Sequence, residues 1–285
     1  FGGCGETLKP RAYVTVGLIF GDEGKGSMVD YLVRLHDASL VVRYSGGPQA
    51  AHTVVLQDGR SHTFAQFGSG SFVPGVRTHL SRYMLIEPFA LMNEAEILAR
   101  TLRTNKEDVL GRLTIDPSCM VITPYHWLLN RLREESRGDG NHGSCGMGVG
   151  EVRAMEIAGK VRSLYLSYAR NKVRTRGILE NIRDYCVEEG RRIDPRSLYL
   201  LSMENENIDA LAEFYYQFWF NTAHADEVDL RNMLRRSVSI FEGAQGVLLD
   251  EVYGFAPYNS WTDITAKNVK RILGEAGVPY TLSAS

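Results

Sequence analysis

Apolar positions along the chain form short continuous runs that alternate with stretches of helical periodicity. The runs at 13–19 and 38–44 predict buried strands, and the stretch 27–35 between them predicts an amphipathic helix. Ser27 and Asp30 have the spacing of a capping box at the start of this helix. Two buried strands joined by a helix form a βαβ unit, so the pattern predicts an α/β fold around a largely parallel central sheet with flanking helices.

The remaining segments predict a hairpin, more short strands and a helical insertion. Residues 52–56 and 61–67 flank a turn at Asp58 and Gly59, which is typical of a β-hairpin. From about 151 to 236 the pattern is helical, and the aromatic cluster 214–220 is expected to pack in a core. The other predicted elements are strands 83–86, 113–115, 120–122 and 238–241 and helices 88–102, 124–137 and 264–275.

Composition narrows the class of protein. The chain has 285 residues, of which 44% are hydrophobic and 23% are charged, as in an ordinary soluble globular protein. A formal net charge of −2 gives no case for nucleic-acid or anionic-membrane partners, and no apolar run approaches the length of a membrane span. The four cysteines are far apart and form no CxxC pair, which favours a reducing compartment and hence the cytoplasm.

A glycine-rich turn, Gly21-Asp-Glu-Gly-Lys-Gly26, connects the first predicted strand to the first predicted helix. Strand, glycine-rich turn and helix form the arrangement that directs backbone N–H groups at a phosphate. The P-loop pattern is not met, because Ile19 stands in place of its first glycine and Gly26 in place of its Ser or Thr. A plain βα turn is therefore a competing interpretation, against which Asp22 and Lys25 favour a metal and a phosphate.

His52 follows a second loop, 45–51, which is too rich in Gly and Pro for regular structure. A lone histidine is more often a packing residue than a catalyst. This one follows a predicted strand, however, and so belongs at the carboxyl edge of the sheet, where open α/β sheets bind ligands.

Three motifs occur in order and at compatible spacing: 21–26, then Val42-Arg-Tyr-Ser-Gly-Gly-Pro-Gln-Ala-Ala-His-Thr53, then Phe241-Glu-Gly-Ala-Gln-Gly246 with Leu248-Leu-Asp250. Together they resemble the adenylosuccinate synthetase family over about residues 13–275. The resemblance implies a P-loop-like fold and a ligase that joins aspartate to carbon 6 of IMP, using GTP and Mg²⁺. It also implies that O6 of the purine is phosphorylated first, and that the working assembly is a homodimer.

The resemblance assigns roles to individual residues. Asp22 matches the family's general base and magnesium ligand, His52 its acid, and Lys25 the residue that cradles the transferred phosphoryl group. The carbonyl of Ala51 matches a second magnesium ligand. The remaining matches are Gly21, Glu23, Gly24, Gly26, Ser27 and Thr53 for GTP and phosphate, and Gln49, Ser144, Cys145, Gln245 and Ser260 for the purine nucleotide.

The chain also departs from the family pattern. Gln49 replaces an asparagine, and in the loop 144–151 Cys145, Met147 and Glu151 replace a threonine, a phosphate-binding arginine and a proline. Met147 cannot bind a phosphate, and we expect Glu151 to repel one. Either Arg153, Lys160 or Arg162 compensates, or the substrate is not plain IMP.

The expected organisation is an extension at 1–12 and an incomplete catalytic domain at 13–285, with a helical subregion at about 151–236. The chain lacks a Met start and its last residues begin like a strand, so it is expected to be a fragment; no aspartate-binding or guanine-selecting motif is found in it. Two other functions stay open. One is a nucleotide-binding paralogue without ligase activity, and the other is a plain phosphotransferase or NTPase.

Overall fold

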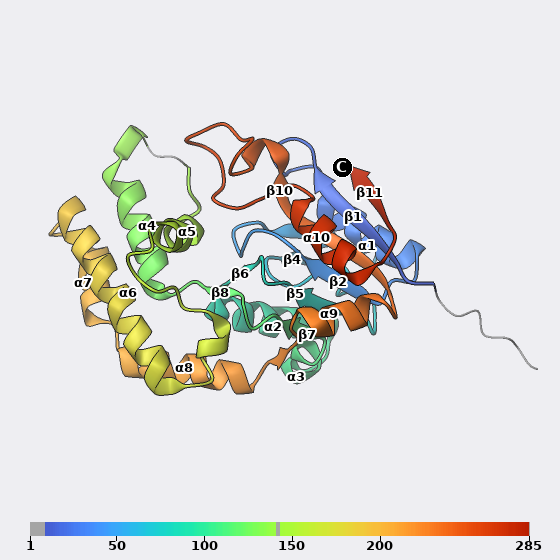
Figure 1. Ribbon diagram of the computed structural model, residues 1–285, viewed down its shortest axis with the longest axis horizontal. Coiled ribbons are helices and arrows are strands. Elements are labelled where there is room, and N and C mark those ends of the chain that lie inside the picture. The colour runs from blue at the N-terminus through green and yellow to red at the C-terminus, as the bar shows by residue number, and fades with distance from the viewer. Residues whose placement is uncertain (1–8, 141–142, 285) are drawn as a thin grey trace, which may run out of the picture.

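A seven-stranded sheet forms the centre of the computed structural model, which describes residues 9–140 and 143–284 (Figure 1). Every pair of neighbouring strands in it is parallel, which confirms the predicted sheet. Across the sheet the strands are β11 (Tyr280–Ala284), β1 (Arg11–Gly17), β10 (Val238–Gly246), β2 (Leu40–Arg43), β5 (Arg77–Leu80), β7 (Leu113–Ile115) and β9 (Ala223–His224).

The strands β1 and β2 are not neighbours, because β10 lies between them. Val14 of β1 pairs with Phe241, and Val42 of β2 pairs with the same residue from the other side. The first two strands predicted along the chain are thus joined by a strand that follows more than 190 residues later. This insertion brings the third sequence motif between the first two.

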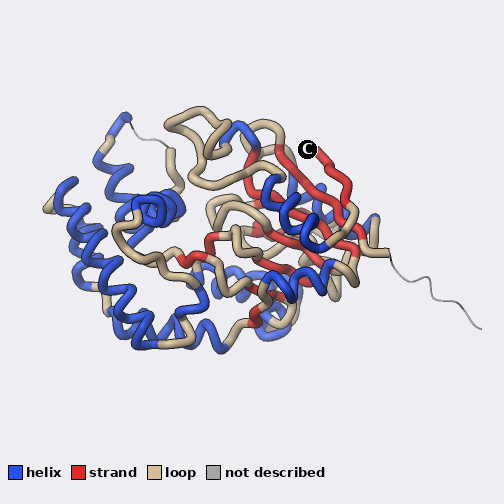
Figure 2. The backbone as a smooth tube through the Cα atoms, viewed as in Figure 1, coloured by secondary structure: helices blue, strands red, loops and turns tan. Residues whose placement is uncertain are grey.

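Helices cover both faces of the sheet, as Figure 2 shows. On one face, α1 (Lys25–Leu35) packs Val29 and Val33 against Val41 and Ile240. On the opposite face, α9 (Glu227–Leu234) and α10 (Lys267–Ala276) pack against Ala12, Val14, Leu40, Val42 and Phe241. Alternate residues of each strand therefore enter the cores on opposite faces of the sheet. Because both faces are buried, the strands need the continuous apolar runs seen in the sequence.

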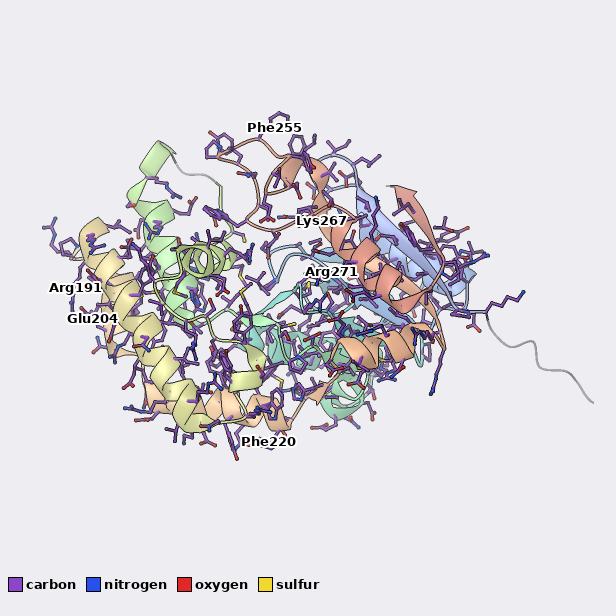
Figure 3. The ribbon with its side chains drawn as sticks, in the orientation of Figure 1. Arg191, Glu204, Phe220, Phe255, Lys267 and Arg271 are labelled. Atoms are coloured by element: carbon purple, nitrogen blue, oxygen red, sulfur yellow. The ribbon has the colours of Figure 1, made fainter. Side chains whose placement is uncertain are left out.

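A helical layer lies beside the sheet, at the left in Figure 1. Its helices are α4 (Pro124–Ser136), α5 (Val149–Ala158), α6 (Lys172–Ile193), α7 (Leu198–Asn205) and α8 (Ile208–Phe220). Within the aromatic cluster, Tyr215 and Phe218 are buried, as predicted, while Phe220 is 61% exposed and points outward in Figure 3. Arg191 of α6 and Glu204 of α7 form a surface ion pair at 2.6 Å, also visible in Figure 3.

The remaining elements connect these layers. The predicted hairpin is present as the antiparallel pair β3 (His52–Val55) and β4 (Ser61–Phe64). Helices α2 (Pro88–Leu102) and α3 (Lys106–Leu110) and the parallel pair β6 (Leu85–Ile86) and β8 (Met120–Val121) complete the set. In the described parts of the chain, none of the helices is both long and apolar enough to cross a membrane.

The helical prediction for about 151–236 was wrong near its end, because strand β9 (Ala223–His224) lies inside that stretch. Two further differences concern the start of the first helix and a strand that was not predicted. Helix α1 begins at Lys25, two residues before the predicted capping box, and its N-cap is Gly24 in the left-handed conformation with φ of 73°. Ser27 is an exposed residue of the first turn. The strand β5 was missed, because Arg77-Thr-His-Leu80 carries polar side chains that are mostly buried by tertiary contacts.

Candidate nucleotide site at the sheet edge

The three motifs meet where three adjacent strands end. The loop after β1 carries Asp22 and Lys25, the loop after β2 leads to His52, and the end of β10 carries Gln245. The first turn of α1 lies directly against the hairpin, because a Cβ on Gly26 would be 2.8 Å from Cβ of His52. The structure therefore brings the predicted catalytic and phosphate-binding residues to one edge, in the position expected for a ligand site of a parallel sheet.

The first glycine-rich loop folds around its own charged side chains. Lys25 is buried at 1% exposure, and its Nζ donates to the carbonyl of Gly21 at 2.6 Å. The carboxylate of Glu23 accepts hydrogen bonds from the backbone N–H groups of Ile19 and Gly21, at 2.8 and 3.0 Å. Its second oxygen lies 3.4 Å from Nζ of Lys25.

These contacts shift the pKa values of Lys25 and Glu23. Burial lowers the pKa of Lys25, and the carboxylates of Glu23, Asp22 and Glu242 offset part of that effect. Burial alone would raise the pKa of Glu23, but the N–H groups of Gly21 and Ile19 and the charge of Lys25 lower it. The loop therefore holds a paired anion and cation of its own.

His52 is held by both ring nitrogens. Nδ1 lies 2.6 Å from a carboxylate oxygen of Glu242, and Nε2 lies 2.8 Å from the carbonyl oxygen of Ala244. Both partners are acceptors, and a neutral imidazole has one N–H, so the doubly protonated ring is the form that satisfies both contacts. An incoming anion could receive the Nε2–H only in place of the carbonyl of Ala244, while Glu242 keeps Nδ1.

Glu242 is fully buried and is fixed from three sides. It stands directly opposite Arg43 in the β10–β2 register, and it accepts hydrogen bonds from the N–H and the hydroxyl of Ser69, at 2.9 and 2.5 Å. Burial would raise its pKa, but Arg43, His52 and Ser69 outweigh burial and lower the pKa of Glu242 to about 2. The carboxylate is therefore ionised and orients the imidazole of His52.

A break in strand pairing positions Gln245. Thr15 of β1 pairs with Glu242 and Gly17 pairs with Gly246, so one residue of β1 faces three of β10. This bulge re-aims the side chains at the end of β10. The Oε1 atoms of Gln245 and Gln49 are both buried without a hydrogen-bond partner, as expected of amide groups that await a polar ligand.

The residues predicted to hold Mg²⁺ fit that ion. Asp22 and Ala51 are both exposed. No cluster of three or more metal-ligating side chains occurs among the described residues. Mg²⁺ is commonly held by one or two carboxylates together with substrate phosphates and water, so a single carboxylate and a carbonyl suit it.

Several predicted contact residues lie away from this centre or are already bonded. Thr53 faces the opposite side of β3 from His52 and contacts Thr63 Oγ1 at 2.9 Å. The Ser260 hydroxyl contacts Thr262 Oγ1 at 2.9 Å. The Ser144 hydroxyl donates to Asn130 at 3.0 Å, and Cys145 is exposed. These residues line or support loops around the site, and their assignment to ligands stays a prediction.

The expectation that Glu151 repels a phosphate is corrected by its ion pair. Arg133 of α4 binds Glu151 at 3.0 Å and Glu189 of α6 at 2.9 Å, so the charge of Glu151 is neutralised between helices. Burial raises the pKa of Glu151, and Arg133 counters that effect. Glu151 therefore fastens α5 to α4 within the helical layer.

The three cations considered as replacements for the missing arginine have other positions. Arg153 donates to the carbonyl of Trp261 at 2.9 Å and so holds the loop that follows β10. Lys160 and Arg162 line a cavity of about 530 Å³ against α6. Among the described residues, the contacts of these three side chains therefore lie away from Met147.

The sequence interpretation overlooked four residues that hold the site: Arg43, Ser69, Glu242 and Asp250. Arg43 and Glu242 could have been found, because each is a charged residue at the end of an otherwise apolar strand and they have opposite signs. Asp250 accepts from the N–H groups of Val252, Tyr253 and Ile264, which orders the loop whose Phe255 projects outward in Figure 3. Ser69 gave no signal.

Comparison with known proteins identifies relatives of the chain. It is 33% identical over 253 residues to an adenylosuccinate synthetase of Chlorobium chlorochromatii, covering 87% of this chain and 55% of the relative. A second relative of that name, from Psychrobacter arcticus, is 32% identical over 263 residues, covering 90% and 57%. The chain thus spans about half the length of the curated relatives it matches.

Solved structures show the same fold. The fully ligated adenylosuccinate synthetase of Plasmodium falciparum matches with a TM-score of 0.77 at 19% identity, over 95% of this chain and 60% of that one. The cyanophage S-2L succinoaminodeoxyadenylate synthetase, bound to dGMP and dATP, matches with a TM-score of 0.52 at 19% identity, over 97% and 64%. The family model described as adenylosuccinate synthetase matches residues 14–281, and the chain therefore belongs to the adenylosuccinate synthetase family.

Proposed function

We propose that this chain provides the purine-phosphorylating part of a ligase that joins L-aspartate to carbon 6 of IMP, or of a related 6-oxopurine nucleotide, with GTP as phosphoryl donor. The observation that carries this proposal is the meeting of Asp22, Lys25, His52 and Gln245 at the carboxyl ends of three adjacent strands. The working protein is expected to be a homodimer, which sedimentation would test.

The first step transfers a phosphoryl group from GTP to O6 of the purine. Asp22 accepts the N1 proton, which raises the nucleophilicity of O6, and the bond from the γ-phosphorus to GDP breaks as the bond to O6 forms. Lys25 and the N–H groups of the first turn of α1 stabilise the charge on the transferred group.

The second step displaces phosphate from carbon 6 by the amine of aspartate. His52, held by Glu242, donates a hydrogen bond to the phosphoryl oxygens, and its charge favours their departure. Gln245 and Gln49 carry amide groups with unpartnered oxygens, and the N–H groups of such amides can donate to O6 of the purine. Mg²⁺ held by Asp22 and Ala51 would neutralise phosphate charge when bound.

Phosphate release by the full-length protein tests the proposal. Turnover should require GTP, Mg²⁺, a 6-oxopurine nucleotide and aspartate together, and Asp22→Asn or His52→Ala should abolish it. Glu96→Gln, which removes an exposed charge of α2, should leave the rate unchanged. Release without a purine or an amino acid would instead indicate a plain NTPase.

A paralogue that binds nucleotides without turnover is the second candidate. Met147 favours it, because a methionine stands where the family pattern has a phosphate-binding arginine and cannot itself bind a phosphate. A change of purine is the third, because the similar cyanophage enzyme is bound to dGMP. Calorimetry with GTP, IMP and dGMP separates them: binding without turnover indicates the paralogue, and turnover with dGMP alone indicates the altered substrate.

A further inference from the structure

The phosphate-binding loop is filled by a side chain of the same loop. The carboxylate of Glu23 takes the N–H groups of Ile19 and Gly21, and it also lies beside the ammonium group of Lys25. Backbone N–H groups and a lysine ammonium are the donors that glycine-rich loops offer to phosphate oxygens. Glu23 therefore uses the ammonium group of Lys25, which a phosphoryl group would use, together with two N–H groups at the start of the same turn.

The backbone around the loop is shaped to receive this carboxylate. A Cβ on Gly17 would lie 2.2 Å from Oε2 of Glu23 and 3.0 Å from Nζ of Lys25. Any side chain at position 17 would push the carboxylate away from the ammonium group. The space beside β1 is thus filled by Glu23 and would be available to another anion if Glu23 moved.

The charges of the loop also indicate that Glu23 and a phosphoryl group compete for Lys25. Among the described residues, the ammonium group of Lys25 donates to the carbonyl of Gly21 at 2.6 Å and to Glu23, which is its charged hydrogen-bond partner. A second anion in this space would be repelled by Glu23 unless the carboxylate left. Binding of a phosphoryl group and the inward position of Glu23 are therefore mutually exclusive.

We propose that Glu23 is an intramolecular substitute for phosphate, which must be displaced before the loop can bind a phosphoryl group. Glu23 then sets the affinity of the loop and favours polyphosphates, whose additional contacts can replace those of the carboxylate, over single phosphate ions. This inference rests on the proposed function, which makes the loop a phosphoryl site.

Calorimetric titration of the full-length protein with inorganic pyrophosphate, without Mg²⁺, tests the proposal. Glu23→Gln keeps an acceptor but loses the charge, and Glu23→Ala empties the space. Both variants should bind pyrophosphate at least about tenfold more tightly than the unchanged protein, with the larger gain for Glu23→Ala. Glu96→Gln on α2 removes the same charge from an exposed site and should leave the affinity unchanged.

Each outcome decides the question. Equal or weaker binding by both Glu23 variants overturns the inference and leaves the proposed function standing. An equal gain in Glu96→Gln shows a net-charge effect and also overturns it. Loss of pyrophosphate binding in every protein, including the unchanged one, removes the phosphate site and with it the proposed function. Thermal unfolding of each variant verifies that it is folded, and Glu23→Gln carries the test if Glu23→Ala is not.

Discussion

The first glycine-rich loop, 21–26, and the glycine-rich loop that precedes α5, 143–148, here called the second, differ in what their polar groups contact. The first is closed by hydrogen bonds among its own residues and is packed between β10 and the hairpin. The second is tied to α4, where the side-chain oxygen of Asn130 accepts from Ser144 and from the N–H of Gly148. The first loop therefore holds charged side chains beside the end of β10, and the second mainly attaches α5 to α4.

The buried charges around the two loops differ in the same way. Glu242, beside the first loop, is fully buried between Arg43, His52 and Ser69. Glu151, beside the second, is a half-buried partner of Arg133. Similar glycine content therefore gives no measure of how strongly a loop is fixed, and the following experiments test this difference.

Glu242→Ala should have the largest effect. Removing this buried carboxylate takes a hydrogen-bond acceptor from His52 and Ser69 and a nearby negative charge from Arg43, which costs about 3–5 kcal/mol of the free energy of unfolding. Urea denaturation at neutral pH measures it. A loss below about 1 kcal/mol would show that the first loop is not anchored by this carboxylate.

Acid should weaken the two regions over different pH ranges. The pKa of Glu242 falls from 4.5 to about 2 on folding, so its contribution is present above pH 4.5 and is lost as the pH falls toward 2. Beside the second loop, burial lowers the pKa of His126 from 6.5 to about 3. The unfolded chain binds that proton first, so this contribution falls from pH 6.5 downward.

Urea denaturation at each pH from 7 to 3 gives the free energy of unfolding, which distinguishes these ranges. Its expected change is on the order of a few kcal/mol. The stability difference between the unchanged protein and Glu242→Gln should stay constant to about pH 4.5 and then narrow. For His126→Asn the losses below pH 6.5 should be smaller than in the unchanged protein. Identical pH profiles for all three proteins would contradict both assignments.

Alanine substitutions at one glycine in or beside each loop should have smaller effects on stability. A Cβ on Gly246 would lie 2.2 Å from the carbonyl oxygen of Ile19, so Gly246→Ala should cost about 1–3 kcal/mol through backbone displacement. Gly143 has a φ of 70° and open space around its Cβ position, so Gly143→Ala should cost about 1–2 kcal/mol from left-handed backbone strain alone, with no added steric overlap. Thermal unfolding of both variants gives the ranking, and the reverse order would refute it.

Glu151→Gln should have the smallest effect. Its partner Arg133 keeps a second ion pair with Glu189, so the loss should be about 0.5–1 kcal/mol. Arg133→Met, which leaves both carboxylates unpaired, should cost more. Equal losses in the two variants would show that Glu189 does not share the arginine.

The sequence predicted more of the first region than of the second. The runs 13–19 and 38–44 and the turn at 21–26 are local patterns, and the structure has strands and a loop there within a few residues. The hairpin at His52 followed from its turn residues. Glu151 was misjudged because a charged residue gives no sign of its partner, and Arg133 lies 18 positions earlier on another helix.

The sequence by itself determined the α/β class, the parallel sheet and the family, because buried strands, glycine turns and motif order are local properties of the chain. Only the tertiary structure decided that β10 enters between β1 and β2. That placement pairs Glu242 with Arg43 and directs it at His52. The tertiary structure also decided that Glu23 turns inward onto Lys25. Hydrogen bonds and strand neighbours depend on contacts between distant residues, which sequence spacing does not fix.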